Sequence, residues 1–184
     1  TRWRMAGYHN LENAMASVAA AVSVGVPFEK AVDALSRFEG VKRRMERTAT
    51  VADIAIYDDF AHHPTAIRKT IASMRRRYPG HRVVVAMEPR SNTMKLGVHK
   101  ETLAASLADA DLVLVYRPQD MGDAFDESLA PLGGKLSLHH DYDQLVSEMS
   151  KKVLSGDQVI FMSNGGFGAA RQTLTALLQR TRGS

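Results

Sequence analysis

Three short segments hold most of the side chains in this sequence that could do chemistry. Residues 58–64 (DDFAHHP) combine two carboxylates with two imidazoles, a set that could hold a ribose, transfer protons or bind a metal ion. Residues 88–93 (EPRSNT) place an arginine on a turn, and a guanidinium can fork onto a carboxylate or a phosphate. Residues 163–168 (SNGGFG) are rich in glycine, and free N–H groups before a helix bind anions. We call them the histidine segment, the arginine segment and the glycine turn.

Each segment also has a plainer interpretation. Asp59 could simply face the amino end of a helix that begins at Pro64. This interpretation does not explain His62 and His63, so a functional role of the segment is favoured. A metal site is much less favoured than the other functional roles. Arg90 could pair with Glu88 or could bind a ligand, and the sequence supports both interpretations equally. The glycine turn could be an ordinary tight turn.

Two nucleotide-binding motifs are absent from these 184 residues. A dinucleotide fingerprint needs a third glycine at the position where this sequence has Arg171. A P-loop needs serine or threonine after its Gly-Lys pair, but Gly134-Lys135 is followed by Leu136. The sequence therefore argues against an oxidoreductase that binds a nicotinamide cofactor. A titration with such a cofactor that gives no fluorescence change would exclude that class.

The elements that must position the three segments are strands that alternate with helices. Apolar runs predict strands at residues 54–57, 83–87, 112–116 and 159–162, a weaker one at 136–138, and a partner strand at 45–51. Helical spacing predicts helices from residue 64, and at 96–107, 124–129, 141–153 and 169–178. This alternation predicts an α/β fold with a Rossmann-like, mainly parallel sheet and helices on both faces. Ligands of such sheets bind outside the carboxyl ends of the strands, so the three segments should meet at one edge.

A short helical segment precedes this predicted sheet. Residues 9–38 predict two helices that are separated near Gly25 and Pro27, with Asn10 as a candidate cap of the first. The apolar stripe of the first helix, including Met15, is expected to face a core. A basic cluster within residues 42–47 marks the boundary with the sheet.

The composition is that of a globular protein. Apolar residues make up 45% and charged residues 24% of the chain, and no apolar run is long enough for a transmembrane helix. The absence of cysteine excludes disulfides, thiolate catalysis and zinc sites built on cysteine. A net charge of +4 is too mild to indicate nucleic-acid binding. Because the chain begins with Thr1 rather than methionine, we expect a piece of a larger protein.

Three ordered motifs resemble the Mur ligase family, whose members are ATP-dependent enzymes that form amide bonds in peptidoglycan metabolism. They are residues 9–13 (HNLEN), residues 40–44 (GVKRR) and the histidine segment. Residues 88–97 and 162–168 resemble the members that join UDP-N-acetylmuramate to the tripeptide L-alanyl-γ-D-glutamyl-meso-diaminopimelate in murein recycling. The alternative within the family is the ligation of L-alanine to UDP-N-acetylmuramate, or another Mur ligase activity.

The resemblance implies a three-domain enzyme of the bacterial cytoplasm, of which this chain is the last part. Residues 1–44 would be the helical tail of the central ATP-binding domain, and residues 45–184 the C-terminal Rossmann-like domain. ATP and Mg²⁺ are the implied cofactors, but the P-loop and the metal ligands are missing here, so the chain alone should be inactive. UDP-N-acetylmuramate and the murein tripeptide are the implied partners, with neither nucleic acid nor membrane.

The resemblance also implies roles for individual residues. ATP would be bound by Asn10, Asn13, Arg44, Asp59 and His62. Arg44 would also be catalytic, because it would reach the phosphates of ATP or the acyl-phosphate, with Arg43 as the weaker candidate. The incoming peptide would be bound by Arg90, Ser91, Asn92, Lys95, Ser163, Asn164, Gly165 and Gly166.

A class outside the family stays open at this point. Arg43, Arg44 and residues 75–77 could form a basic surface for nucleic acid, in which case the chain would be a non-catalytic binding module. Residues 75–77 are better explained as a solvated helix face.

Overall fold

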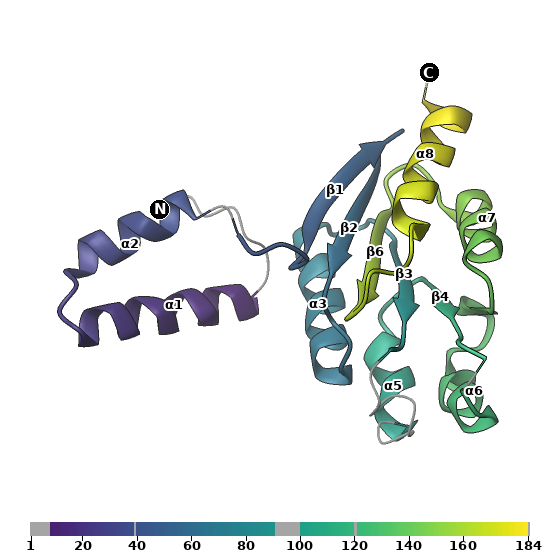
Figure 1. Ribbon diagram of the computed structural model, residues 1–184, viewed down its shortest axis with the longest axis horizontal. Coiled ribbons are helices and arrows are strands. Elements are labelled where there is room, and N and C mark those ends of the chain that lie inside the picture. Colours follow the sequence, from purple (N-terminus) through teal and green to yellow (C-terminus); the bar gives the residue numbers. More distant parts are fainter. Residues whose placement is uncertain (1–7, 39, 91–99, 120, 184) are drawn as a thin grey trace.

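The chain forms a helical hairpin followed by an α/β domain (Figure 1). The computed structural model describes residues 8–38, 40–90, 100–119 and 121–183. The hairpin consists of α1 (Tyr8–Ser23) and α2 (Phe28–Arg37). The strands of the domain are β1 (Glu46–Val51), β2 (Ile54–Asp59), β3 (Val83–Glu88), β4 (Leu112–Tyr116), β5 (Leu136–His139) and β6 (Gln158–Ser163). Its helices are α3 (Pro64–Arg77), α5 (Lys100–Leu107), α6 (Asp123–Leu129), α7 (Tyr142–Lys152) and α8 (Ala170–Arg182), with a 3₁₀ turn at Ala130–Lys135.

The described strands form one six-stranded sheet in the order β1-β2-β6-β3-β4-β5. The edge strand β1 runs antiparallel to β2 and has a register shift between Arg47 and Ala49, whereas the other pairings are parallel. β6 is therefore inserted between β2 and β3. This order confirms the predicted α/β fold with a mainly parallel sheet.

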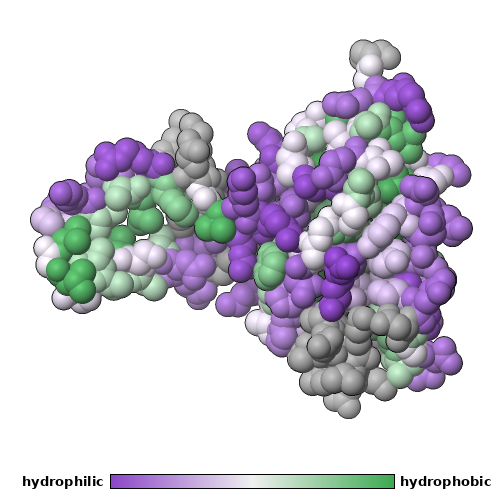
Figure 2. Space-filling model, viewed as in Figure 1, coloured by the Kyte–Doolittle hydropathy of each residue, from purple (hydrophilic) through white to green (hydrophobic). Residues whose placement is uncertain are grey.

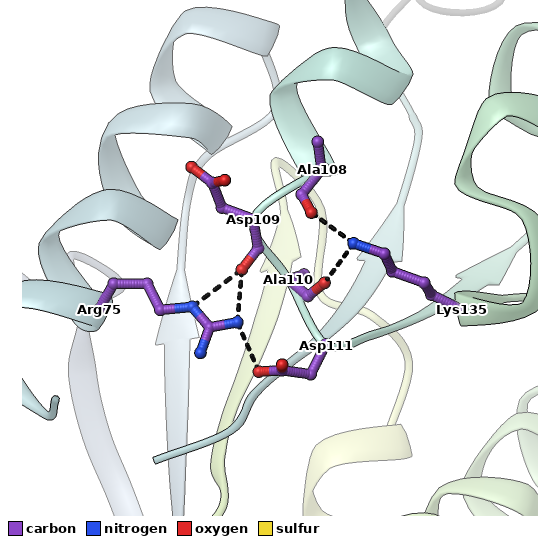
Figure 3. A pocket seen from close by; sticks show the side chains of 6 residues that line it. All are labelled: Arg75, Ala108, Asp109, Ala110, Asp111 and Lys135. Carbon is purple, nitrogen blue, oxygen red and sulfur yellow. Dashed lines mark hydrogen bonds and ion pairs between the residues drawn. The ribbon is translucent and has the colours of Figure 1, made fainter. Parts of the chain in front are cut away.

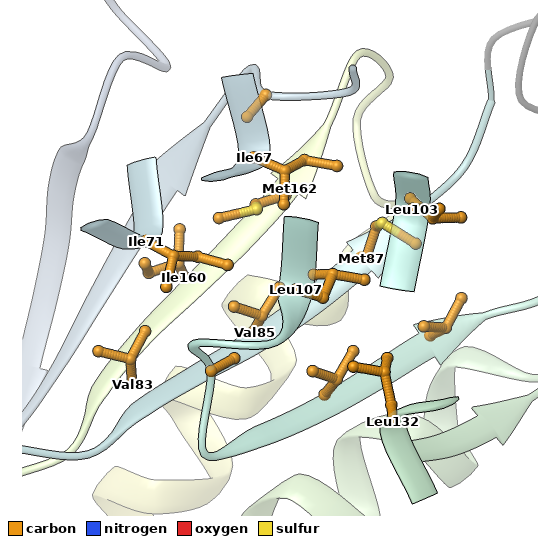
Figure 4. Close-up of a cluster of buried hydrophobic side chains, with 14 of the residues drawn as sticks. Ile67, Ile71, Val83, Val85, Met87, Leu103, Leu107, Leu132, Ile160 and Met162 are labelled. Atoms are coloured by element: carbon orange, nitrogen blue, oxygen red, sulfur yellow. The ribbon is translucent and has the colours of Figure 1, made fainter. Parts of the chain in front are cut away.

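Helices cover both faces of the sheet, as predicted. Alternate residues of β3 point to opposite faces, so Val83, Val85 and Met87 pack under α3 and α5 (Figure 4). Val84 and Ala86 pack under α7 and α8 on the other face. Burying one large apolar side chain contributes roughly 1.5–3 kcal/mol, so these two clusters are the main source of stability.

Local signals fix where the helices begin. α3 starts with Pro64 at its first position, and the His63 side chain accepts a hydrogen bond from the Thr65 N–H at 3.3 Å. Asp141 caps α7 in the same way, because its carboxylate accepts from the Gln144 N–H at 2.9 Å. The first of these caps sets the direction in which the chain leaves the histidine segment.

The helical hairpin corrects two predictions. Asn10 is not a cap, because α1 already begins at Tyr8 and Asn10 lies buried within the helix. Met15 was expected in a core but is 65% exposed, whereas Met74 and Met149 of the α/β domain are buried. The reason is that, among the described elements, α1 packs mainly against α2, and Figure 2 shows apolar residues gathered on the surface of the hairpin. Among the described residues, no helix is both long and apolar enough to span a membrane.

Candidate functional site at the carboxyl edge of the sheet

The three polar segments do meet at one edge of the sheet. They follow β2, β3 and β6, which are parallel neighbours. The register places Asp59 opposite Met162 and Glu88 opposite Ser163. The three strands therefore end at the same height along the sheet, and the segments that follow them begin side by side. The predicted convergence is confirmed, and we call this place the carboxyl edge.

The carboxylate of Glu88 is the centre of a buried network at this edge. Its Oε2 accepts hydrogen bonds from the Ser163 hydroxyl at 2.5 Å and from the Phe167 N–H at 3.1 Å. Its Oε1 accepts from the Tyr142 hydroxyl. Burial and this hydrogen bond to an anion raise the pKa of the Tyr142 hydroxyl. One side chain thus joins the ends of β3 and β6 to α7.

Arg90 extends from this network toward solvent. Its Nε lies 3.8 Å from Glu88 Oε1, and 55% of its side chain is exposed. The aliphatic stem crosses Gly165 so closely that a Cβ atom at that position would overlap Arg90 Cδ. The predicted pairing with Glu88 is therefore confirmed, while ligand binding by the exposed side of the guanidinium stays a prediction.

The glycine turn is shaped by internal contacts. The Ser163 hydroxyl accepts a hydrogen bond from the Gly165 N–H at 2.8 Å while it donates to Glu88. The Asn164 Oδ1 atom is buried and has no hydrogen-bond partner within the described part of the chain, whereas Gly166 is exposed. Of the predicted peptide-binding residues, the structure brings Arg90 and Gly165 into contact and places Ser163 beneath them. Ser91, Asn92 and Lys95 lie outside the described residues.

Asp59 lies at the same edge but faces inward. Its Oδ2 accepts from the Met45 N–H at 2.8 Å, and its Oδ1 accepts from the Ala61 N–H at 2.9 Å and from Thr70 Oγ1 at 3.3 Å. Burial raises the pKa of Asp59, although these N–H donors oppose the shift. As it stands, the carboxylate fastens the end of β2 to the chain before β1 and to α3.

His62 is also held locally. Its Nδ1 lies 2.9 Å from the Phe60 carbonyl oxygen, and its ring packs edge-on against the Phe60 ring at a centroid distance of 5.1 Å. The imidazole is half-buried, so it forms part of the wall of the carboxyl edge.

The two neighbouring arginines of the boundary segment point in different directions. Arg44 is exposed, with its guanidinium 5.3 Å from the centre of the Phe60 ring. Arg43 turns inward and donates from Nη2 to the carbonyl oxygens of Ser163, at 2.6 Å, and of Gly165. The sequence ranked Arg44 first as the functional residue, but the contact with the glycine turn belongs to Arg43.

Asn10 and Asn13 lie on a separate element, α1. Asn10 is buried and Asn13 is exposed. One contact between α1 and the domain is an ion pair at 3.7 Å between Glu12 and Lys69 of α3, the helix that follows the histidine segment. The two asparagines are therefore carried by the hairpin and not by the sheet.

A hollow at the opposite, amino edge of the sheet is explained by structural contacts (Figure 3). Lys135 Nζ donates to the carbonyl oxygens of Ala108, at 2.5 Å, and Ala110, at 3.2 Å, just beyond the end of α5. Arg75 donates to the Asp109 carbonyl oxygen and pairs with the Asp111 carboxylate at 2.6 Å. Cations stabilise helix carboxyl ends, so this hollow is a capped helix terminus. Arg75 was expected on a solvated helix face, but its guanidinium is instead bound by the Asp109 carbonyl oxygen and the Asp111 carboxylate.

The sequence analysis named Glu88 only as a possible partner of Arg90 and Arg43 only as the weaker catalytic candidate, and it missed Tyr142. A signal for Glu88 was present, because it is a charged residue that ends an otherwise apolar buried strand. Nothing in the sequence pattern indicates Tyr142, which comes from α7. Among the described residues, no group of three or more His, Asp or Glu side chains could hold a metal ion.

Comparisons with known proteins agree with this architecture. UDP-N-acetylmuramate--L-alanyl-gamma-D-glutamyl-meso-2,6-diaminoheptandioate ligase of Haemophilus influenzae is 39% identical over 178 residues, covering 94% of this chain and 38% of that protein. UDP-N-acetylmuramate--L-alanine ligase of Desulfitobacterium hafniense is 31% identical over 182 residues, covering 92% of this chain and 40% of that protein. A crystal structure of a murein peptide ligase from Psychrobacter arcticus is 39% identical and superposes with a TM-score of 0.76, covering 97% of this chain and 38% of that one.

The chain thus spans well under half the length of these relatives. The family model described as "Mur ligase, glutamate ligase domain" matches residues 43–165. This stretch includes the complete histidine and arginine segments and the sheet that presents them. Since the match covers more than half of the 184 residues, this chain belongs to the Mur ligase family.

Proposed function

We propose that this chain is the C-terminal part of an ATP-dependent ligase that joins UDP-N-acetylmuramate to the tripeptide L-alanyl-γ-D-glutamyl-meso-diaminopimelate in murein recycling. Its carboxyl edge binds the incoming peptide. The observation that carries this proposal is Arg90, a half-exposed guanidinium anchored by Glu88 and laid across Gly165. A bidentate arginine suits the carboxylate at the diaminopimelate end of such a peptide.

We assign residues 1–44 to the tail of the central ATP-binding domain and residues 45–184 to the C-terminal domain. Two observations support this division. β1 begins at Glu46, directly after the boundary segment, and the family model begins at residue 43. The hairpin before the boundary packs mainly on itself, as expected for a piece whose neighbours belong to the other domain.

In the complete enzyme, the γ-phosphoryl group of ATP passes to the muramate carboxylate, which yields an acyl-phosphate and ADP. The alanyl amine of the tripeptide attacks the acyl carbon, loses a proton and expels phosphate. The role of this chain is to hold the peptide in position for that attack. The described residues do not fit a magnesium site, and we expect the ligands of Mg²⁺ in the missing part of the central domain.

Asn10, Asn13, Arg44, Asp59 and His62 remain our proposal for the ATP-facing side. Arg44 is the residue best placed to reach phosphates, because its guanidinium is exposed beside Phe60. For Asp59 to hold a ribose, one of its hydrogen bonds to Ala61, Met45 or Thr70 would have to be exchanged for a ribose hydroxyl. We also propose that the reaction takes place in the bacterial cytoplasm, where ATP and UDP-sugars are available.

The test is an NMR titration of the labelled chain with three ligands. The diaminopimelate tripeptide should shift amides in the glycine turn and beside Arg90, whereas the lysine tripeptide, which lacks the terminal carboxylate, should bind at least about tenfold more weakly. Free L-alanine tests the alternative ligase activity of the D. hafniense relative. Shifts with L-alanine at the same residues and none with the tripeptide would replace the proposal by that alternative.

A further inference from the structure

Arg43 makes a set of contacts that goes beyond the family motif. Its Nη2 donates to two carbonyl oxygens of the glycine turn, at Ser163 and Gly165, and the first distance is 2.6 Å. Its Nε lies 3.5 Å from the Asp58 carboxylate, and its guanidinium lies 5.3 Å from the centre of the Phe60 ring. One side chain from the boundary segment thus spans the histidine segment and the glycine turn.

The backbone of Arg43 is fixed as firmly as its side chain. Its N–H donates to Glu46 Oε2 at 2.9 Å, and its carbonyl oxygen accepts from the Phe60 N–H at 2.8 Å. Its φ of 60° is in the left-handed region, which an arginine adopts only where surrounding contacts hold it. This conformation is what sends Arg43 inward while Arg44 stays at the surface.

The two carbonyl contacts determine how the glycine turn presents its N–H groups. In a trans peptide group the N–H points opposite to the preceding carbonyl. With the Ser163 and Gly165 carbonyls directed at Arg43, the N–H groups of Asn164 and Gly166 are directed away from it. A Cβ atom at Gly166 would meet nothing within 4 Å, so the open side of the turn lies there.

We propose that Arg43 is a positioning residue that sets the shape of the glycine turn, so that the turn and Arg90 together fit the peptide carboxylate. Gly165 then lies between two guanidinium groups, with Arg43 on its carbonyl and Arg90 across its Cα. The effect on peptide binding rests on the proposed function, whereas the effect on the shape of the turn does not.

The test compares three variants of the whole chain. Arg43→Ala removes all the contacts of the guanidinium. Arg43→Lys keeps the charge but loses the planar fork that can serve several acceptors at once. Arg171→Ala is the matched control. Arg171 belongs to α8, and its guanidinium lies 3.4 Å from the same Asp58 carboxylate. It makes no described hydrogen bond to the glycine turn. Urea unfolding of each variant reports whether it is folded.

The first measurement needs no ligand. In wild-type and variant spectra, the amide resonances of Asn164, Gly165 and Gly166 should move in both Arg43 variants and stay in place in Arg171→Ala. Unmoved resonances in a folded Arg43→Lys or Arg43→Ala protein would overturn the inference, and so would equal shifts in Arg171→Ala.

The second measurement is the affinity for the diaminopimelate tripeptide. We expect the Kd to rise about tenfold in Arg43→Ala and by a smaller factor in Arg43→Lys, with no change in Arg171→Ala. Full affinity in a folded Arg43→Lys chain would show that charge alone suffices and would refute the role of the fork. If the wild-type chain binds no tripeptide, the proposed function fails, and the ligand-free spectra still decide the role of Arg43 in the turn.

Discussion

Each of the two edges of the sheet carries a partly exposed arginine, Arg75 at the amino edge and Arg90 at the carboxyl edge, but the two residues differ in how many contacts they make with described residues. At the amino edge, Arg75 donates to the carbonyl oxygens of Asp109 and His81 and to the Asp111 carboxylate, and 35% of its side chain is exposed. At the carboxyl edge, the ion pair that the described residues give Arg90 is a long one with Glu88, and 55% of the Arg90 side chain is exposed. A surface hollow lies beside the first arginine. Within the described part of the chain, the donors of Arg75 are therefore used by the fold, whereas the guanidinium of Arg90 is the more exposed of the two.

The strongest test of this comparison is to remove the anchor of the carboxyl edge. Glu88→Ala should lower the free energy of unfolding by about 3 kcal/mol, because it leaves the buried donors of Ser163, Phe167 and Tyr142 without an acceptor. Urea denaturation measures the loss. Glu88→Gln keeps one acceptor and should lose less. A loss below about 1 kcal/mol for Glu88→Ala would mean that the network is not what holds this edge.

Arg75→Ala should separate stability from binding. It should lower the free energy of unfolding by about 1–2 kcal/mol, since several hydrogen bonds to partly exposed backbone acceptors are lost. The affinity for the diaminopimelate tripeptide should not change, because the amino edge lies at the other end of the strands. Weakened peptide binding in this variant would erase the distinction between the two edges.

Arg90→Ala should show the opposite pattern. We expect at least about tenfold weaker binding of the tripeptide, while the free energy of unfolding stays within about 0.5 kcal/mol of wild type. Calorimetric titration and urea unfolding of the same preparation give both values. Unchanged affinity would remove Arg90 from the site.

Gly165→Ala probes the same contact from the other side. The added methyl group would overlap Arg90 Cδ, so the arginine must move while the fold can persist. Tripeptide affinity should fall about as far as in Arg90→Ala, with less than about 1 kcal/mol lost in stability. Gly134→Ala is the matched control, because a Cβ there meets nothing within 4 Å. Equal binding by both glycine variants would contradict the close packing of Arg90 on Gly165.

The smallest expected effect concerns an ion pair far from both arginines. Burial raises the pKa of Glu148, but hydrogen bonds from Lys152, at 2.5 Å, and Ser137, at 2.6 Å, together with the charges of Lys152 and His139, outweigh it, so the pKa lies below the ordinary value. A carboxylate with a lowered pKa stabilises the fold above its unfolded pKa of about 4.5, and this contribution is lost as the pH falls through the folded pKa.

Glu148→Gln should therefore cost less than about 1 kcal/mol at pH 7, because the group is only partly buried. The difference from wild type should shrink below pH 4.5, which urea unfolding at several pH values can follow. Glu127→Gln, an exposed residue on α6, is the control. A difference that grows on acidification would reverse the sign of this argument.

The sheet and its polar edge were predictable, because apolar runs mark buried parallel strands and chain order determines which loops share an edge. Val83, Val84 and Val85 are apolar on both sides of the strand, and this pattern has few alternatives. The exposure of Met15 was not predictable from periodicity, since periodicity shows that a helix has an apolar face but not what covers it.

Within the candidate site, it was easier to predict which residue types take part than the direction in which each side chain points. Arg43 and Arg44 are identical in type and adjacent in sequence, and what separates them is a left-handed backbone at Arg43 together with contacts from residues more than 100 positions away. Similarly, Asp58 and Asp59 alternate in direction, so Asp58 pairs with Arg43 and Arg171 while Asp59 turns inward. Tertiary contacts decide such choices, and a local pattern does not contain them.

The position of β1 has a consequence for the behaviour of the chain at high concentration. An open sheet edge can accept a strand from another molecule, which is how many β-proteins aggregate. Here the register shift between Arg47 and Ala49 interrupts the row of open N–H and C=O groups, and charged Glu46 and Arg47 stand at the start of the strand. The other edge, β5, is only four residues long. Both ends of the sheet are therefore poor templates for strand addition, and the hydrogen-bonded ladder stops within a single molecule.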